Sequence, residues 1–346
     1  MFSTIIEFVL FELKFNTLQL LSLTSKDVKN EIDNMRISVI LRLYKVIISE
    51  NIITRYKIIS LDFTIFTMSD ITEEYFKIFL KLIPKCNDLT KINLRNNRIG
   101  SKGAKELTEV LGQCDFLANL KVLNLTNNKI GPEGIESLAA VLVNCNALAT
   151  LDLSENKFGD TGIKYLEQLL SRLGSLTILN LREIQIGPIG AEKLASILLQ
   201  CCSRGSRGSC GSRGSRSSLT HLDISYNNIG PIGTQKLATA LVSPQCSSRD
   251  SLTHLDISYN NIGPLGAESI ASVLDQCRSL TLLNLCGNRI GPVGAEELAA
   301  MLVRPQCNVI SHLYLESNYV GNTGAKSLER AKLQCSSLKY LFYKDY

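Results

Sequence analysis

Apolar and polar positions along this chain follow a two-part pattern that recurs roughly every 28 residues. In the first part they alternate, as in residues 120–125, where Leu123 and Leu125 are predicted to point inward. In the second part apolar residues recur at helical spacing, as in residues 135–142. Each unit therefore predicts a short strand followed by a helix. A chain of many such units is typical of a solenoid and not of a globule with one central core.

A short phrase, Leu-x-x-Asn-x-Ile-Gly, marks the end of each predicted strand. It first occurs at residues 94–100 and returns at intervals of 28 to 33 residues, with one longer interval of 43. We expect the Asn side chain to bond backbone groups of the turn that follows the strand. One unit has Ile184 in this place, so we expect a weaker turn there, with Gln185 as a substitute. The column consists of Asn97, Asn128, Asn156, Asn227, Asn260, Asn288 and Asn318.

The helical half of several units opens with Gly-Pro and closes near a Cys-x-x-Leu step. Residues 288–295 read Asn-Arg-Ile-Gly-Pro-Val-Gly-Ala, and residues 277–280 read Cys-Arg-Ser-Leu. From about residue 89 to its end the chain resembles the ribonuclease-inhibitor type of leucine-rich repeat. NOD-like receptors and the activator protein of the Ran GTPase carry this type too. The resemblance implies an α/β fold, a horseshoe-shaped leucine-rich repeat solenoid with parallel strands on the concave face and helices on the convex face.

The chain divides into two predicted parts. Residues 1–57 show no repeat and are predicted to be a mostly helical cap or docking segment, because a solenoid needs its apolar end covered. Residues 58–346 are predicted to form the solenoid, beginning with a degenerate unit in which Leu61 stands where Ile92 stands in the next. A Ser-Arg-Gly tract at 202–217 lacks apolar residues and is predicted to be a disordered insertion.

Composition says little about binding partners, but cysteine usage indicates the cellular compartment. The formal net charge of +5 is too small to indicate a nucleic-acid-binding protein. Seven of the 11 cysteines share one repeat position, where one unit has Leu173 instead, so we expect free, buried thiols and a reducing, cytoplasmic location. Apolar stretches fall short of a membrane span, and we expect no signal peptide. The seven cysteines that share the repeat position are Cys86, Cys114, Cys145, Cys246, Cys277, Cys307 and Cys335.

Motifs for catalysis are missing from the sequence. It has no phosphate-binding loop, no H-E-x-x-H, no C-x-x-C and no G-x-S-x-G, so we expect a protein that is not an enzyme and has no cofactor. The chain's three histidines share one repeat position, and His221 and His254 are each followed two residues later by Asp. Two His and two Asp can hold a divalent metal. We favour a duplicated polar pair without metal, because residues 218–231 and 251–264 are identical.

Exposed strand positions predict a binding surface on the concave face. Solenoids bind partners there, and its middle is acidic, so we expect a partner with basic groups. Tyr226 and Tyr259 are the expected anchors, because Tyr is favoured at binding hot spots. The candidate partner-binding residues are Asn124, Asp152, Glu155, Asn180, Glu183, His221, Asp223, Tyr226, His254, Asp256, Tyr259, Asn284, His312 and Tyr314. A neighbouring column, also expected to be exposed, is Arg95, Thr126, Ser154, Arg182, Ser225, Ser258, Cys286 and Glu316.

The sequence therefore predicts a monomeric scaffold that binds another protein, of unknown identity. Two alternatives stay open. The first is a regulator of a small GTPase, by resemblance to the Ran activator, although the chain lacks that family's long acidic C-terminal tail. The second is an RNA-associated protein that uses the Ser-Arg-Gly tract, although this tract has no aromatic residue for base stacking and we do not expect nucleic-acid binding.

Overall fold

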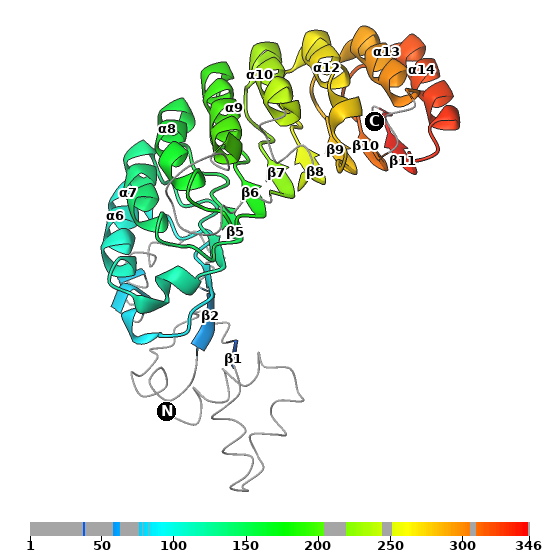
Figure 1. The fold of residues 1–346 in the computed structure, drawn as a ribbon. Coiled ribbons are helices and arrows are strands. Elements are labelled where there is room, and N and C mark those ends of the chain that lie inside the picture. Colours follow the sequence, from blue (N-terminus) through cyan, green and yellow to red (C-terminus); the bar gives the residue numbers. More distant parts are fainter. Residues whose placement is uncertain are drawn as a thin grey trace, which may run out of the picture.

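The computed structural model of the chain describes residues 37–38, 58–62, 76–77, 79–81, 83–203, 219–243, 251–304 and 309–344. Within these ranges the chain forms an arc, with strands along its inner side and helices along its outer side (Figure 1). The fold class predicted from the sequence, a leucine-rich repeat solenoid, is confirmed.

The inner side is an 11-stranded parallel sheet in which every strand pairs with its neighbour in sequence. Most strands have three residues, which is enough to place one buried side chain between two outward ones. The strands are β1 (Ile37–Ser38), β2 (Ile58–Asp62), β3 (Lys91–Asn93), β4 (Val122–Asn124), β5 (Thr150–Asp152), β6 (Ile178–Asn180), β7 (His221–Asp223), β8 (His254–Asp256), β9 (Leu282–Asn284), β10 (His312–Tyr314) and β11 (Tyr340–Phe342).

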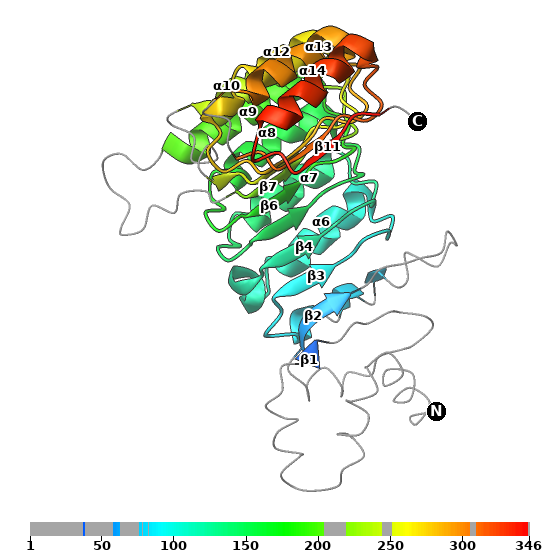
Figure 2. The same ribbon diagram turned by 90° about the vertical axis from the view of Figure 1, so that its right-hand side faces the viewer.

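The outer side is a row of helices, and each packs on the helix of the next unit. Proline stands in the first turn of α7, α10, α12 and α13, where its missing N–H costs no internal hydrogen bond. The helices are α6 (Gly100–Leu111), α7 (Pro132–Leu142), α8 (Gly159–Leu170), α9 (Pro188–Ser203), α10 (Gly230–Val242), α12 (Gly263–Ala271), α13 (Gly291–Leu302) and α14 (Gly321–Gln334). Figure 2 shows the strands following one another in chain order from β1 upwards, with α6 behind the sheet and α12, α13 and α14 above it. Short 3-10 turns are η1 (Ile83–Lys85), η2 (Asp115–Asn119) and η3 (Leu274–Gln276).

The core lies between sheet and helices and continues from unit to unit. The middle residue of each strand from β3 to β11 is a buried Leu or Ile, and successive middle residues pair in register. Leu123 and Leu125 are both fully buried, as predicted. Because no unit has enough apolar surface to form a core alone, stability depends on stacking.

Buried asparagines join neighbouring units through backbone groups. Asn156 is fully buried, and its Oδ1 accepts the N–H groups of Asn128 and Ile130, both at 3.0 Å. Its Nδ2 donates to the carbonyl of Leu125 in the previous unit at 2.8 Å and to that of Leu153 in its own unit at 3.0 Å. The Asn column therefore satisfies backbone groups at the end of each strand, as predicted, and also links each unit to the one before it.

The unit with Ile184 in the Asn place departs from this arrangement. Ile184 is fully buried, and Gln185 is exposed, so Gln185 does not replace the amide. The backbone N–H groups of Ile184 and Ile186 are still satisfied, because Asn227 Oδ1 accepts both, at 3.1 and 3.2 Å. Because Ile184 has no side-chain amide, this unit provides no side-chain oxygen at this position that could accept backbone N–H groups of the preceding unit. The expected weakness of this turn stays a prediction.

Several predicted boundaries meet the structure only in part. Leu61 pairs in register with Ile92, so residues 58–62 belong to the same sheet as the next unit. Residues 1–57 were expected to be mostly helical, but Ile37–Ser38 form β1 and pair with β2. The rest of that segment lies outside the described residues. Helix α9 extends to Ser203, so the first two residues of the predicted 202–217 insertion are helical, and the tract from 204 onwards also lies outside the described residues.

Of the seven cysteines at the repeated position, five lie in the described residues, and Cys246 and Cys307 lie outside them. Cys86, Cys145, Cys277 and Cys335 are buried and Cys114 is half-buried. Burial raises the pKa of the Cys145 thiol to about 12, which keeps it protonated. Free, buried thiols were expected at these positions. The reducing, cytoplasmic location inferred from them stays a prediction.

Candidate functional site

Two rows of side chains line the concave face, one on each side of the buried middle row. We call them row 1 (the first residue of each strand from β3 to β11) and row 3 (the third residue). The parallel register places the members of each row side by side on adjacent strands. Row 1 is Lys91, Val122, Thr150, Ile178, His221, His254, Leu282, His312 and Tyr340. Row 3 is Asn93, Asn124, Asp152, Asn180, Asp223, Asp256, Asn284, Tyr314 and Phe342.

The structure brings the 14 residues predicted from the sequence onto this one face. His221, His254 and His312 lie in row 1, and Asn124, Asp152, Asn180, Asp223, Asp256, Asn284 and Tyr314 lie in row 3. The remaining four, Glu155, Glu183, Tyr226 and Tyr259, follow their strands by three residues, at a turn position with positive φ.

Sequence reasoning missed the apolar members of the two rows. Ile178 and Tyr340 of row 1 are 36% and 50% exposed, and Phe342 of row 3 is 42% exposed. Leu282 lies half-buried between His254 and His312. Aligning the first strand residue of every unit would have found them, because row 1 is largely apolar or aromatic from β6 to β11.

The carboxylates of row 3 accept hydrogen bonds from backbone groups at the ends of their own strands. Asp223 Oδ1 accepts the N–H of Ser225 at 2.8 Å, and Asp256 Oδ1 accepts that of Ser258 at 2.9 Å. The pKa of Asp223 is raised, mainly because burial disfavours the charged form and also because Asp256 repels it. Hydrogen bonds from Ser225 and the charge of Arg182 oppose this shift. A further positive charge from outside would stabilise the ionised pair.

The column next to row 3 is less exposed than expected. Thr126, Ser154, Ser225 and Ser258 are buried, so they are not part of the accessible surface. The hydroxyl groups of Ser154 and Ser258 donate to the Asp Oδ1 of their own strands, at 2.6 and 2.7 Å. Small side chains that bond inward to the strand end are covered by the larger residues beside them. Arg95, by contrast, is exposed, and Arg182, Cys286 and Glu316 are half-buried.

Tyr226 and Tyr259 form a rigid stack with both ring faces covered. Their ring centroids are 4.2 Å apart, and the Arg182 guanidinium lies 3.9 Å from the Tyr226 centroid. On the other side, a Cβ added to Gly287 would lie 2.5 Å from Tyr259 Cδ1, so the ring lies directly over this glycine. The two rings are about 40% exposed (39% and 41%), and they present edges and hydroxyl groups to solvent. A partner therefore meets their edges, not their faces.

His221 and His254 also stack, and the hydroxyl before each sets its tautomer. Their ring centroids are 4.0 Å apart. Thr253 Oγ1 lies 2.8 Å from His254 Nδ1 and donates its one proton to the carbonyl of Thr220 at 3.0 Å. Nδ1 must then donate to the hydroxyl, which leaves Nε2 as an unprotonated acceptor. The same arrangement of a hydroxyl between Nδ1 and a carbonyl recurs before His221 and His312.

Acid is expected to destabilise this histidine cluster. The pKa of His254 is lowered below 6.5, first by burial and then by the charges of His221 and His312. A lowered pKa means that the unfolded chain binds the proton more tightly, so stability present above pH 6.5 is lost as pH falls through the folded-state pKa. The variant His254→Phe keeps the stacking and removes the titration. Between about pH 8 and pH 5 its urea midpoint should fall less than that of the wild type, and equal falls would contradict the assignment.

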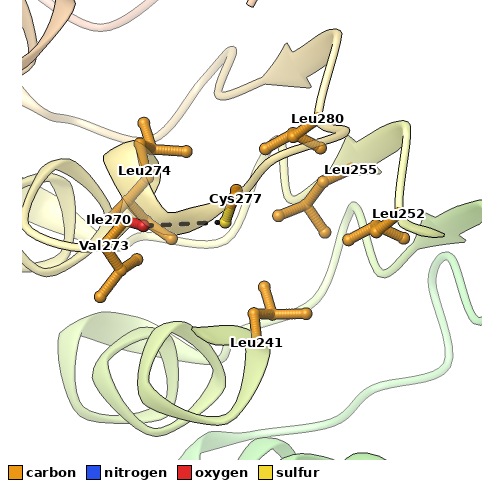
Figure 3. A pocket seen from close by; sticks show the side chains of 8 residues that line it. All are labelled: Leu241, Leu252, Leu255, Ile270, Val273, Leu274, Cys277 and Leu280. Atoms are coloured by element: carbon orange, nitrogen blue, oxygen red, sulfur yellow. Dashed lines mark hydrogen bonds between the residues drawn. The ribbon is translucent and has the colours of Figure 1, made fainter. Parts of the chain in front are cut away.

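The described residues hold no metal-binding cluster, and the apolar cavity between the helices is too small for a ligand. They contain no group of three or more His, Cys, Asp or Glu side chains arranged to hold a metal ion. The cavity drawn in Figure 3 has a volume of about 10 Å³ and is lined by Leu241, Leu252, Leu255, Cys277 and other apolar side chains. An apolar space of this size is a packing gap in the core. None of the described helices has the length and hydrophobicity to cross a bilayer.

Comparison with known proteins identifies the repeat. A family model described as Leucine Rich repeat matches residues 85–107, 117–139, 144–166, 216–238, 251–271 and 276–299. A search of curated proteins finds no match.

Solved structures with which the chain can be aligned include an internalin, InlF, from Listeria monocytogenes, at 17% identity over 95% of this chain and 87% of that one, with a TM-score of 0.48. Another is LegL7 of Legionella pneumophila, described as leucine-rich repeat-containing, at 20% identity over 89% and 91%, with a TM-score of 0.46. A third is the actin-binding site 2 of leiomodin-1, at 17% identity over 36% and 70%, with a TM-score of 0.32. Six matched repeats and a sheet built from one strand per unit show that this chain contains leucine-rich repeats and folds as a leucine-rich repeat solenoid.

Proposed function

We propose that this protein binds another protein, one with basic groups, on the concave face of its solenoid. Leucine-rich repeats generally serve as scaffolds for protein–protein interaction, and the inner surface of a solenoid is the surface such proteins use. The observation that carries the proposal is the pairing of the two identical units. They place Asp223 beside Asp256, and the exposed edges of Tyr226 beside Tyr259.

Physical chemistry favours this region over the rest of the concave face. Tyr226 and Tyr259 are held in place by stacking, so binding costs them little side-chain entropy. The pKa of Asp223 is raised, first by burial and also by the charge of Asp256, and a cationic partner would favour the ionised form of this carboxyl group. Buried aromatic anchors with adjacent charges are typical of binding hot spots.

Affinity capture from extracts of the source cell tests the proposal. The bait is the full chain, compared with Tyr226→Ala/Tyr259→Ala and with a control, Leu333→Ala, whose side chain on α14 is 89% exposed. Proteins captured by wild type and control are then titrated as purified proteins. We expect the double variant to lose about tenfold or more in affinity, the usual size for two anchor residues. Equal affinity of all three baits would contradict a binding site at these tyrosines.

Finer assignments stay predictions. The ribonuclease-inhibitor subtype and the monomeric state follow from the sequence pattern and are part of this proposal. Regulation of a small GTPase is checked by a GTP-hydrolysis assay, and RNA binding by deleting residues 203–216 and measuring RNA retention at several salt concentrations. Neither alternative draws on the paired carboxylates and tyrosines, so the scaffold function is preferred.

A further inference from the structure

We infer that the part of the partner held by β6 to β11 is an amphipathic α-helix that lies across the strands, with an apolar side on row 1 and a basic side on row 3. This inference rests on the proposed function and specifies the partner's chemistry. Its basis is the different character of the two rows on β6 to β9, where row 1 is apolar or aromatic and row 3 is polar or acidic; on β10 and β11 both rows are aromatic.

Row 1 provides an apolar strip on these strands. It comprises Ile178, His221, His254, Leu282, His312 and Tyr340. The two stacked imidazoles carry no charge in their neutral form, and His312 stacks on Tyr340 with centroids 4.6 Å apart. A partner that covers this row with aliphatic side chains removes apolar surface from water, at about 25 cal/mol for each Å².

On β6 to β9 row 3 provides polar and acidic groups, about two residues further along each strand and roughly 7 Å from row 1, whereas on β10 and β11 it consists of the stacked rings of Tyr314 and Phe342. Asp223 and Asp256 lie there, with Asn180 and Asn284 on either side. The exposed Glu183 adds a third carboxylate at the adjoining turn, while Arg182 is taken up by its stack on Tyr226. The charge complementary to this side is a set of Lys or Arg side chains.

Strand spacing matches helix pitch. Neighbouring strands are about 4.8 Å apart, and an α-helix advances about 5.4 Å in each turn. A helix laid across the strands therefore presents about one turn to each strand, with side chains three or four positions apart facing the same row. The five intervals from β6 to β11 cover about 24 Å, the length of roughly 16 helical residues.

Backbone chemistry argues against an extended partner on this face. From β6 to β10 every strand is paired on both sides, so its N–H and C=O groups are used within the sheet. An extended chain crossing these strands would find no backbone partners for its own polar groups. A helix satisfies its backbone internally and offers side chains alone, which is what this face can bind.

Two synthetic peptides of identical composition test the inference. Both contain only Leu and Lys and are about 14 residues long, four helical turns. One places Leu at helical spacing, and the other alternates Leu and Lys as in a strand. Fluorescence anisotropy with the full chain measures affinity, and circular dichroism measures peptide helicity on binding. We expect the helical-pattern peptide to bind at least about tenfold more tightly and to become helical.

Protein variants locate the peptide. Asp223→Asn/Asp256→Asn replaces each carboxylate by an amide whose oxygen can still accept the N–H two residues later. Two negative charges are removed, so affinity should fall about tenfold. Ile178→Thr/Leu282→Thr should weaken binding about fivefold through row 1. The matched control is Glu268→Gln/Glu296→Gln, which removes two exposed charges from the convex helices α12 and α13 and should leave affinity unchanged.

Other outcomes overturn the inference in distinguishable ways. If both peptides bind equally and both depend on Asp223 and Asp256, the partner is basic but is not recognised as a helix. If the helical-pattern peptide binds more tightly but has the same affinity for wild type and for Ile178→Thr/Leu282→Thr, the helix does not lie on row 1. If the aspartate variant and the Glu268/Glu296 control behave alike for both peptides, the acidic concave site of the proposed function fails as well.

Discussion

Replacing Asn156 with alanine is expected to lower the free energy of unfolding by about 4 kcal/mol, a large loss for one exchange. The side chain is fully buried and accepts the N–H groups of Asn128 and Ile130 while donating to carbonyls of two units. Alanine leaves the two N–H groups without this acceptor in a place that water does not reach, while the Leu125 carbonyl still accepts from Asn128 Nδ2 at 2.9 Å. Each orphaned buried group costs about 1–3 kcal/mol.

Urea unfolding measures the overall loss, and hydrogen exchange locates it. Exchange of the Asn128 and Ile130 amides should accelerate first, since these lose their acceptor directly. Asn146→Ala is the matched control, because Asn146 is exposed and should change stability by no more than about 0.5 kcal/mol. If both variants unfold at the same urea concentration, the Asn column does not hold the units together.

Reversing Asp223 and Asp256 to Lys is expected to weaken binding of a basic partner by at least about 100-fold. Two attractive charges become two repulsive ones at the centre of the site, and each close charge pair at an interface is worth about 1.5 kcal/mol or more. Isothermal titration at two salt concentrations measures the effect. Wild-type affinity should fall with salt, because charges at the edge of a contact are screened over about 10 Å at 0.1 M.

The comparison for this reversal is Glu268→Lys/Glu296→Lys, with the same change of net charge on the convex helices. It separates a local effect from a change in the overall field. Circular dichroism checks that both proteins fold, since a Lys at 223 or 256 cannot accept the N–H two residues later. Retained affinity in the folded Asp223→Lys/Asp256→Lys protein would rule out the acidic surface as the binding site.

Much of the fold was accessible from the sequence because its signals are local and repeated. Alternation around Leu123 and the Asn-x-Ile-Gly phrase each report the geometry of one unit, and stacking repeats that geometry. Register follows for the same reason, so the meeting of His221 with His254 and of Asp223 with Asp256 could be predicted.

The candidate site was predictable only at the level of which face carries it. Burial of Thr126 and Ser154 depends on hydrogen bonds and on larger neighbours across strands, which a single unit does not reveal. Coverage of both ring faces of the tyrosine stack depends on Arg182 and Gly287, from two other units. Contacts between units combine side chains about 30 residues apart, so periodicity predicts their proximity but not their orientation.

The exact duplication of residues 218–231 in 251–264 poses a problem of register for any partner. Two copies of one surface lie a single strand apart, so a ligand that reads only the shared residues binds in two positions shifted by about 4.8 Å. Flanking residues break this degeneracy, since Arg182 borders the first copy and Gly287 the second. Removing the difference between these two borders should bring the affinities of the two ligand positions closer together.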